Sequence, residues 1–192
     1  MNNRTDMRQT RAITGDFTVR DEGDQLRLEG YFAVFGSTYE LWPGATESID
    51  LHAFDDCLTD DVRCLVNHDT RLVLGRTKAG TLTLRVDNHG LFGSVVINKS
   101  DTDAMNLYSR VQRKDVDQCS FGFDILEQET EYREDGSVHW TLKKVKLYEV
   151  SCVTFPAYTE TSVEARQREF EQIKKRELDA WKARQKGRLT HA

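Results

Sequence analysis

Short apolar or alternating runs, separated by polar turns, recur along most of this chain. The run from Leu26 to Phe35 begins with alternation and becomes apolar, as a buried strand does, and Val62 to Val66 predicts another strand. Thr81 to Val86 and Leu91 to Ile97 flank a polar turn and predict a β-hairpin. Further strands are predicted from Gln118 to Leu126, and over 138–154 as two strands or one long bent strand.

Helical spacing occurs at three places. A short helix is predicted over 51–60, around Leu51, Phe54 and Leu58. The segment from Ser100 to Asp103 has the signature of a helix start, with apolar residues following at helical spacing. Residues 160–187 contain no glycine before Gly187 and predict a long charged helix, with an apolar stripe at Phe170, Ile173, Leu178 and Trp181. The pattern predicts an α+β fold with a mainly antiparallel sheet or barrel.

Charge is distributed unevenly between the body and the C-terminal segment. The net charge of the 192 residues is −5, whereas Lys and Arg outnumber Asp and Glu between Glu164 and Arg188. A basic amphipathic tail on an acidic body indicates docking on a partner, or packing of its stripe on its own domain. We therefore predict a flexible segment over 1–15, a folded domain over 16–158 and a charged helical tail over 159–192.

Bulk composition excludes several classes. Hydrophobic residues make up 38% of the chain, which suffices for a core, but no window approaches the roughly 18 apolar residues of a membrane span. The negative net charge disfavours a nucleic-acid binder. The four cysteines form no C-x-x-C pair, so we expect free buried thiols, no zinc site and no cofactor. A soluble intracellular protein is expected.

Three stretches supply the residue types of a hydrolytic site. Ser120 lies in a predicted strand whose other face carries Cys119, Phe121 and Phe123, and Gly122 leaves the serine face unobstructed. His68 ends an apolar strand, where an imidazole can accept a serine proton. Together with a carboxylate that orients the imidazole, they would form a catalytic triad.

The third role has two candidates. Glu149 lies within an apolar strand, where a buried carboxylate needs a cation or a strong donor such as an imidazole N–H. Asp69, the immediate neighbour of His68, is its rival, and Ser151 would lie on the same strand face as Glu149. Each residue also has an ordinary explanation: a solvent-facing serine, a turn histidine, and a glutamate paired with Lys144 or Lys146. A Cys119 nucleophile is disfavoured, because strand parity directs its side chain inward.

The ordered set of motifs resembles the prohead proteases of tailed phages, the HK97-type capsid maturation serine proteases. The resemblance spans about residues 28–158 and rests on Gly30-Tyr31-Phe32-Ala33-Val34-Phe35, Asn67-His68-Asp69, Leu74-Gly75-Arg76, His89-Gly90-Leu91, Ser120-Phe121-Gly122-Phe123, Leu147-Tyr148-Glu149-Val150-Ser151 and Val153-Thr154-Phe155-Pro156-Ala157. One departure from the family pattern is that Pro43-Gly44-Ala45 is separated here from Leu51-His52-Ala53-Phe54.

The resemblance implies a β-barrel ringed by helices, related to the herpesvirus assemblin protease. It implies a serine endopeptidase with Ser120 as nucleophile, His68 as general base and Glu149 at the family's acidic position, where herpesvirus relatives use a second histidine. The implied substrates are the scaffolding segment of the major capsid protein and the protease itself. The implied location is the assembling procapsid in the host cytoplasm, with activity that depends on concentration or on a homo-oligomer.

Two alternatives come from other classes. A non-catalytic assembly factor would use the β body as a binding module and the basic tail to dock on an acidic scaffold. A metal-dependent hydrolase would use His68 and Asp69, but no second histidine lies at ligand spacing.

Overall fold

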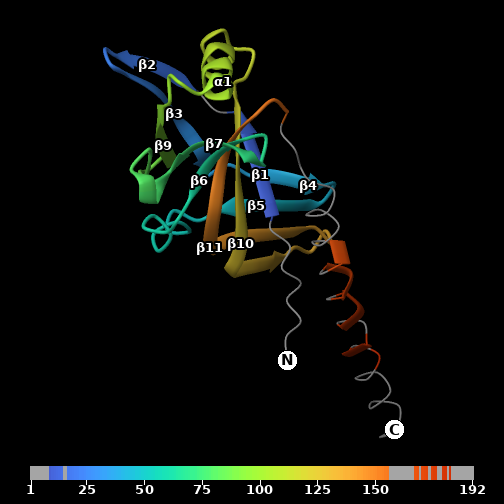
Figure 1. Ribbon diagram of the computed structural model, residues 1–192. Coiled ribbons are helices and arrows are strands. Elements are labelled where there is room, and N and C mark those ends of the chain that lie inside the picture. The colour runs from blue at the N-terminus through green and yellow to red at the C-terminus, as the bar shows by residue number, and fades with distance from the viewer. Residues whose placement is uncertain are drawn as a thin grey trace, which may run out of the picture. The chain divides into compact units, whose positions relative to one another are not determined.

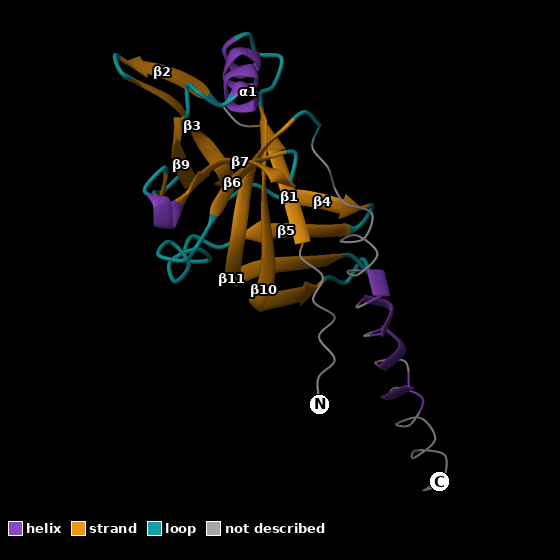
Figure 2. Cartoon of the chain, viewed as in Figure 1, coloured by secondary structure: helices purple, strands orange, loops and turns teal. Residues whose placement is uncertain are grey.

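The computed structural model describes residues 9–14, 17–155 and parts of the segment 167–182 (Figure 1). The chain divides into two compact units, Met1–Tyr158 and Thr159–Ala192. In the described part of the first unit, strands dominate and one α-helix occurs (Figure 2). No helix among the described residues combines the length and the apolar character that crossing a membrane requires.

The larger sheet has seven strands and is organised around one long antiparallel ribbon. Its order is β1-β10-β11-β5-β4, and β6 pairs with β11 and β7. The strands are β1 (Gln9–Thr14), β4 (Tyr39–Trp42), β5 (Ala45–Ile49), β6 (Arg63–Val66), β7 (Asp69–Arg76), β10 (Gln118–Tyr132) and β11 (Val138–Val153). Strand β11 runs parallel to β5 and to β6, and the other pairings are antiparallel.

The second sheet has four antiparallel strands in the order β2-β3-β9-β8. They are β2 (Thr18–Glu22), β3 (Gln25–Val34), β8 (Leu82–Val86) and β9 (Gly90–Ile97), and β8 and β9 form the predicted hairpin. A 3₁₀ turn, η1 (Thr77–Ala79), precedes β8, and the helix α1 (Thr102–Gln112) follows β9.

Apolar side chains from both sheets and from α1 form one core. Alternate residues of β3 are buried, as the alternating start of the Leu26 run predicted. Helix α1 contributes Ala104, Leu107, Tyr108 and Val111. The four cysteines, Cys57, Cys64, Cys119 and Cys152, are buried and unbridged, which confirms the prediction of free thiols.

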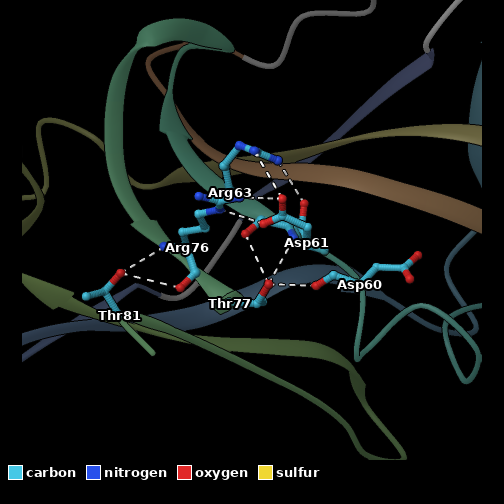
Figure 3. Close-up of polar contacts among 7 residues, drawn as sticks. Asp60, Asp61, Arg63, Arg76, Thr77 and Thr81 are labelled. Carbon is cyan, nitrogen blue, oxygen red and sulfur yellow. Dashed lines mark hydrogen bonds and ion pairs between the residues drawn. The ribbon is translucent and has the colours of Figure 1, made fainter. Parts of the chain in front are cut away.

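The hairpin β6–β7 is fixed at its base by an ion pair (Figure 3). Arg76 donates from Nε and from its terminal nitrogen to the two carboxylate oxygens of Asp61, at 2.6 Å each. Arg63 joins the same carboxylate at 3.2 Å. The Thr77 hydroxyl bridges the two ends by accepting from Val62 N at 2.9 Å and donating to the Asp60 carbonyl at 2.6 Å. These bonds hold the outer ends of β6 and β7 together. The Asn67-His68 tip of the hairpin forms hydrogen bonds with β11.

The mainly antiparallel β fold is confirmed, but the expected closure is not. The described strands form two open sheets rather than one closed barrel. Strand β11 of the β10–β11 ribbon pairs with β5 over residues 138–142 and with β6 over residues 149–152. The two halves of the ribbon therefore have different neighbouring strands, and the sheet stays open.

The helix predicted over 51–60 is wrong, because this segment forms a series of turns. Its backbone bonds run from Ala53 N to Asp50 O, Asp55 N to His52 O and Cys57 N to Phe54 O, each spanning three residues. An α-helix needs consecutive bonds that span four residues. Of the three residues whose spacing predicted the helix, Phe54 is buried, Leu58 is partly buried and Leu51 is 52% exposed, so they do not form one buried face.

The structure also bears on the predictions for the two ends of the chain. Residues 9–14, which the sequence placed in a flexible segment, form strand β1. The described residues between 167 and 182 are helical, as expected, and the remainder of the predicted helix over 160–187 lies outside the described residues, including Ile173, Leu178 and Trp181.

The start of α1 yields a stability prediction. The Asp101 carboxylate accepts from the backbone N–H groups of Asp103 (2.9 Å) and Ala104 (3.3 Å). Replacing Asp101 by Ala should lower the free energy of unfolding by about 1 kcal/mol, because both donors lose their partner. Asp101→Asn keeps an acceptor and should retain most of the stability. Urea denaturation followed by circular dichroism measures both, and equal losses in the two variants would contradict the cap.

Candidate active site

The candidate base lies on a strained two-residue turn. Strands β6 and β7 are joined by Asn67 and His68, whose φ angles are +49° and +59°. Positive φ at both central residues is the mark of a type I′ hairpin turn, for which Asn-Gly is the favoured pair. Histidine in this region costs on the order of 1 kcal/mol or more relative to glycine. The imidazole is therefore present against the backbone preference of its position.

Hydrogen bonds to β11 hold this turn in place. Asn67 N donates to the Cys152 carbonyl at 2.9 Å, and Thr154 N donates to the Asn67 side chain at 2.9 Å. His68 N donates to the Ser151 hydroxyl oxygen at 3.2 Å. The backbone of the turn is thus anchored up to His68 N, which limits the positions that the ring can take.

The imidazole contacts the carboxylate that the sequence singled out. His68 Nδ1 lies 2.7 Å from Glu149 Oε1, and the Ser151 hydroxyl donates to Glu149 Oε2 at 2.6 Å. Only 4% of the Glu149 side chain is exposed. Because burying an unpaired carboxylate is costly, these two contacts account for its presence in an apolar strand.

The carboxylate also decides which ring nitrogen is available for chemistry. An ionised carboxylate only accepts hydrogen bonds, so Nδ1 carries the proton that it receives. In the neutral imidazole, Nε2 is then the acceptor. Nε2 is buried and makes no hydrogen bond within the described part of the chain. Nε2 of His68 is therefore available to accept a proton.

Gly122 provides the space for this carboxylate. Gly122 lies opposite Glu149 in the β10–β11 register, and a Cβ at this position would lie 2.2 Å from Glu149 Oε1. That distance is far inside van der Waals contact, so any larger residue must displace Glu149. The sequence predicted that Gly122 leaves the serine face unobstructed, but the space over Gly122 is filled by Glu149.

Ser120 lies next to this group on β10. It is paired with Ser151 across the ribbon, and paired residues place their side chains on the same face of a sheet. Ser120, Ser151 and Glu149 therefore lie on one face of the ribbon, and Glu149 is two residues before Ser151 on β11. The Ser120 hydroxyl donates to the Arg11 carbonyl of β1 at 2.8 Å, and the residue is fully buried. The structure thus brings His68 and Glu149 into direct contact and places Ser120 opposite Ser151 on the same face of the ribbon, with the Ser120 hydroxyl bonded to β1.

Asp69 does not take part in this network. Its two carboxylate oxygens accept from Arg71, at 3.0 Å from Nε and 2.7 Å from a terminal nitrogen. The same guanidinium lowers the pKa of Asp69 to about 2. Of the two carboxylates that competed for the third role, Glu149 contacts the imidazole and Asp69 is bound to Arg71.

Two other histidines and Cys119 are engaged elsewhere. His52 contacts Asp55, and His139 lies between the hydroxyls of Thr46 and Ser48. The Cys119 thiol donates to the Tyr31 carbonyl, and burial raises its pKa well above the ordinary value. Because the thiolate is the nucleophilic form, Cys119 is a poor candidate nucleophile.

A buried ion pair between β1 and β5, on the sheet face opposite to Ser120, was missed by sequence reasoning. The Arg11 guanidinium donates to both oxygens of Glu47, at 2.5 and 2.9 Å, and both residues are fully buried. The only local signal was the β-branched content of the Gln9–Thr14 stretch, which is too short to distinguish a strand from a polar terminus.

The Gly122 contact yields a prediction for the His68–Glu149 bond. In Gly122→Ala the added methyl group should displace the Glu149 carboxylate, so the low-field proton resonance of the His68 Nδ1–H···carboxylate bond should disappear from the NMR spectrum. Gly93→Ala is the matched control, since its Cβ would meet the Phe32 ring at 2.5 Å. The control should lose stability from overpacking but keep the resonance. Retention of the resonance in folded Gly122→Ala would contradict this account.

Comparison with solved structures returned the capsid assembly protease of bacteriophage T4. The two chains share 11% sequence identity with a TM-score of 0.43, and the match covers 77% of this chain and 99% of the T4 protein. No curated protein sequence matches the chain significantly.

Comparison with protein-family models gives a match over residues 15–176, which include the hairpin that carries His68 and both strands of the β10–β11 ribbon. That match is to the serine proteases that tailed phages use in prohead maturation. The chain belongs to the caudovirus prohead serine protease family.

Proposed function

We propose that this protein matures a phage capsid by serine endopeptidase chemistry in which Ser120, His68 and Glu149 act as nucleophile, general base and orienting acid. The observation that carries the proposal is the 2.7 Å contact between His68 Nδ1 and Glu149 Oε1. It fixes the tautomer that leaves Nε2 free to accept a proton, which is the role of the acid in a serine triad.

The reaction begins when the Ser120 hydroxyl leaves the Arg11 carbonyl. Rotation about its Cα–Cβ bond redirects the hydroxyl on the face that it shares with Glu149 and Ser151. Nε2 of His68, buried and without a partner among the described residues, then takes the proton as the oxygen attacks the scissile carbonyl. Catalytic hydrogen bonds in unliganded enzymes often form only once substrate is bound.

The later steps use the same groups. The imidazolium gives its proton to the leaving amine, and a water molecule, activated in turn by His68, releases the acid from the Ser120 ester. Glu149 stabilises the positive ring throughout. Ser151 acts through Glu149 and His68, because its hydroxyl donates to one and accepts from the backbone N–H of the other.

The substrates follow from the family and not from the geometry of the site. We propose the scaffolding segment of the major capsid protein, and the protease itself, as the chains that are cut. Cleavage would take place inside the assembling procapsid in the host cytoplasm, with activity controlled by local concentration or by formation of a homo-oligomer. A relation of the two-sheet fold to herpesvirus assemblin is part of the same proposal.

The nucleophile can be tested by co-expression with the capsid protein of the same phage. Ser120→Ala should leave the capsid protein at full length, since loss of a triad member typically lowers turnover by on the order of 10⁴-fold. Gel electrophoresis and intact mass of the capsid protein provide the measurement. Shortened capsid protein with folded Ser120→Ala would exclude Ser120. If wild-type protein neither shortens capsid protein nor reacts with a fluorophosphonate at Ser120, it is an assembly factor.

The acid can be tested with a matched pair of amide substitutions. Glu149→Gln should lower kcat by about 10⁴-fold, because the amide favours the wrong imidazole tautomer. Asp69→Asn should keep kcat within about threefold of wild type, since Asp69 contacts Arg71 and not the ring. Steady-state hydrolysis of a fluorogenic peptide measures both, and the opposite ranking would assign the third role to Asp69.

A further inference from the structure

Strand β1 occupies the position at which an extended peptide would meet the nucleophile. It lies at one end of the strand order of the larger sheet, next to β10 (Figure 1). The two strands pair antiparallel, with Ala12 opposite Ser120. Addition of an extended segment to a sheet edge is a common mode of peptide recognition, in which backbone bonds supply affinity and side-chain pockets supply specificity.

The contact at the nucleophile has the form of a substrate contact. Ser120 Oγ lies 2.8 Å from the Arg11 carbonyl oxygen, so the carbonyl that accepts from the hydroxyl belongs to a peptide bond of the chain itself. While this bond exists, the hydroxyl proton is directed at β1 and not at His68. The strand therefore covers Ser120 and also holds its hydroxyl in an unreactive orientation.

The side chain of the same residue fills a charged pocket. Arg11 is paired with Phe121, so its side chain lies on the sheet face opposite to that of Ser120. There its guanidinium binds both oxygens of Glu47, at 2.5 and 2.9 Å, and lies over the Phe123 ring at 5.6 Å from the centroid. This planar geometry with two parallel hydrogen bonds suits arginine, because a lysine ammonium group cannot form it.

We propose that β1 is bound as an internal substrate mimic, and that the site selects peptides with arginine at the Arg11 position through Glu47. The proposal deepens the proposed function and rests on it. A peptide that replaces β1 without a basic side chain would leave the Glu47 carboxylate buried without this cation, which is the costly way to break a buried ion pair. Arginine in the incoming peptide restores the pair.

This arrangement also specifies the bond that is cut. The Ser120 oxygen bonds to the carbonyl carbon of the arginine, and the C–N bond to the next residue breaks. The hydroxyl proton passes through His68 to the departing amine, and one water molecule then hydrolyses the ester. Cleavage is therefore expected immediately after arginine, which in the chain itself is the Arg11–Ala12 bond.

Because β1 is part of the same chain, it competes strongly with a free peptide for the site beside Ser120. A segment joined by a short link is present at an effective concentration on the order of millimolar, so a free peptide reaches the site only when β1 detaches. Such a strand delays cleavage until substrate is concentrated, as it would be inside an assembling shell.

The first experiment uses a charge reversal that keeps the ion pair. Three quenched-fluorescence peptides carry the sequence of residues 7–16, with Arg, Gln or Glu at the Arg11 position. Wild-type full-length protein should cleave the Arg peptide with a kcat/KM on the order of 100-fold or more above that of the Glu peptide. The double variant Arg11→Glu/Glu47→Arg should prefer the Glu peptide. Reversal of the exposed pair Lys144 and Asp56, as Lys144→Asp/Asp56→Lys, should leave the preference for arginine unchanged.

A purely structural role of the ion pair would leave peptide preference unmoved. A folded double variant that still prefers the Arg peptide overturns the proposal, as does cleavage mapped by mass spectrometry to any bond other than the one after position 11. If the double variant fails to fold, Glu47→Gln replaces it: its Arg-to-Glu preference should fall at least tenfold, and an unchanged preference overturns the proposal.

Occupancy of the site by β1 has a separate measurement. Arg11→Gln weakens the hold of the strand, so Ser120 in the folded variant should react with a small fluorophosphonate at least tenfold faster than in wild type. An unchanged rate overturns the mimicry. Absence of any reaction in all variants argues instead against Ser120 as nucleophile, whereas cleavage of all three peptides at equal rates contradicts the arginine pocket alone.

Discussion

The contact between the His68 ring and the buried Glu149 carboxylate is the constraint on which the site depends. A carboxylate that is 4% exposed must be compensated, and the imidazole and the Ser151 hydroxyl supply that compensation. By binding Glu149, the ring acquires a fixed tautomer and an Nε2 that has no partner among the described residues. Two other features serve the same contact: the absence of a side chain at Gly122 and the left-handed turn that carries His68.

Much of the fold could be predicted from local patterns, because alternation and apolar runs report burial directly. The β8–β9 hairpin, the start of α1 and the strands that carry Ser120 and Glu149 were all readable in this way. The segment 51–60 was misread because the spacing of Leu51, Phe54 and Leu58 matches a helix, although only Phe54 of the three is buried and the backbone forms successive turns. Closure into a barrel was predicted wrongly, because pairings such as those of β11 with β5 and β6 join segments that are far apart in the sequence. Local patterns contain no information on such pairings.

The site shows the same division. Residue chemistry singled out His68, Ser120 and Glu149, and the buried position of Glu149 in an apolar strand was the most informative of the three. The position of Arg11 and its pair with Glu47 could not be predicted, since both depend on β1 joining β10. A polar six-residue stretch near a terminus has the composition of a disordered tail, and only the sheet edge that receives it makes it a strand.

The backbone at position 68 has a consequence for how this family should diverge. A type I′ turn favours glycine or asparagine at its second central residue, and only selection for an imidazole keeps histidine in that conformation. In lineages whose capsids no longer need processing, this codon should drift towards the residue that relaxes the turn. An Asn-Gly pair at the tip of the β6–β7 hairpin would then mark a relative that keeps the fold and has lost the candidate base.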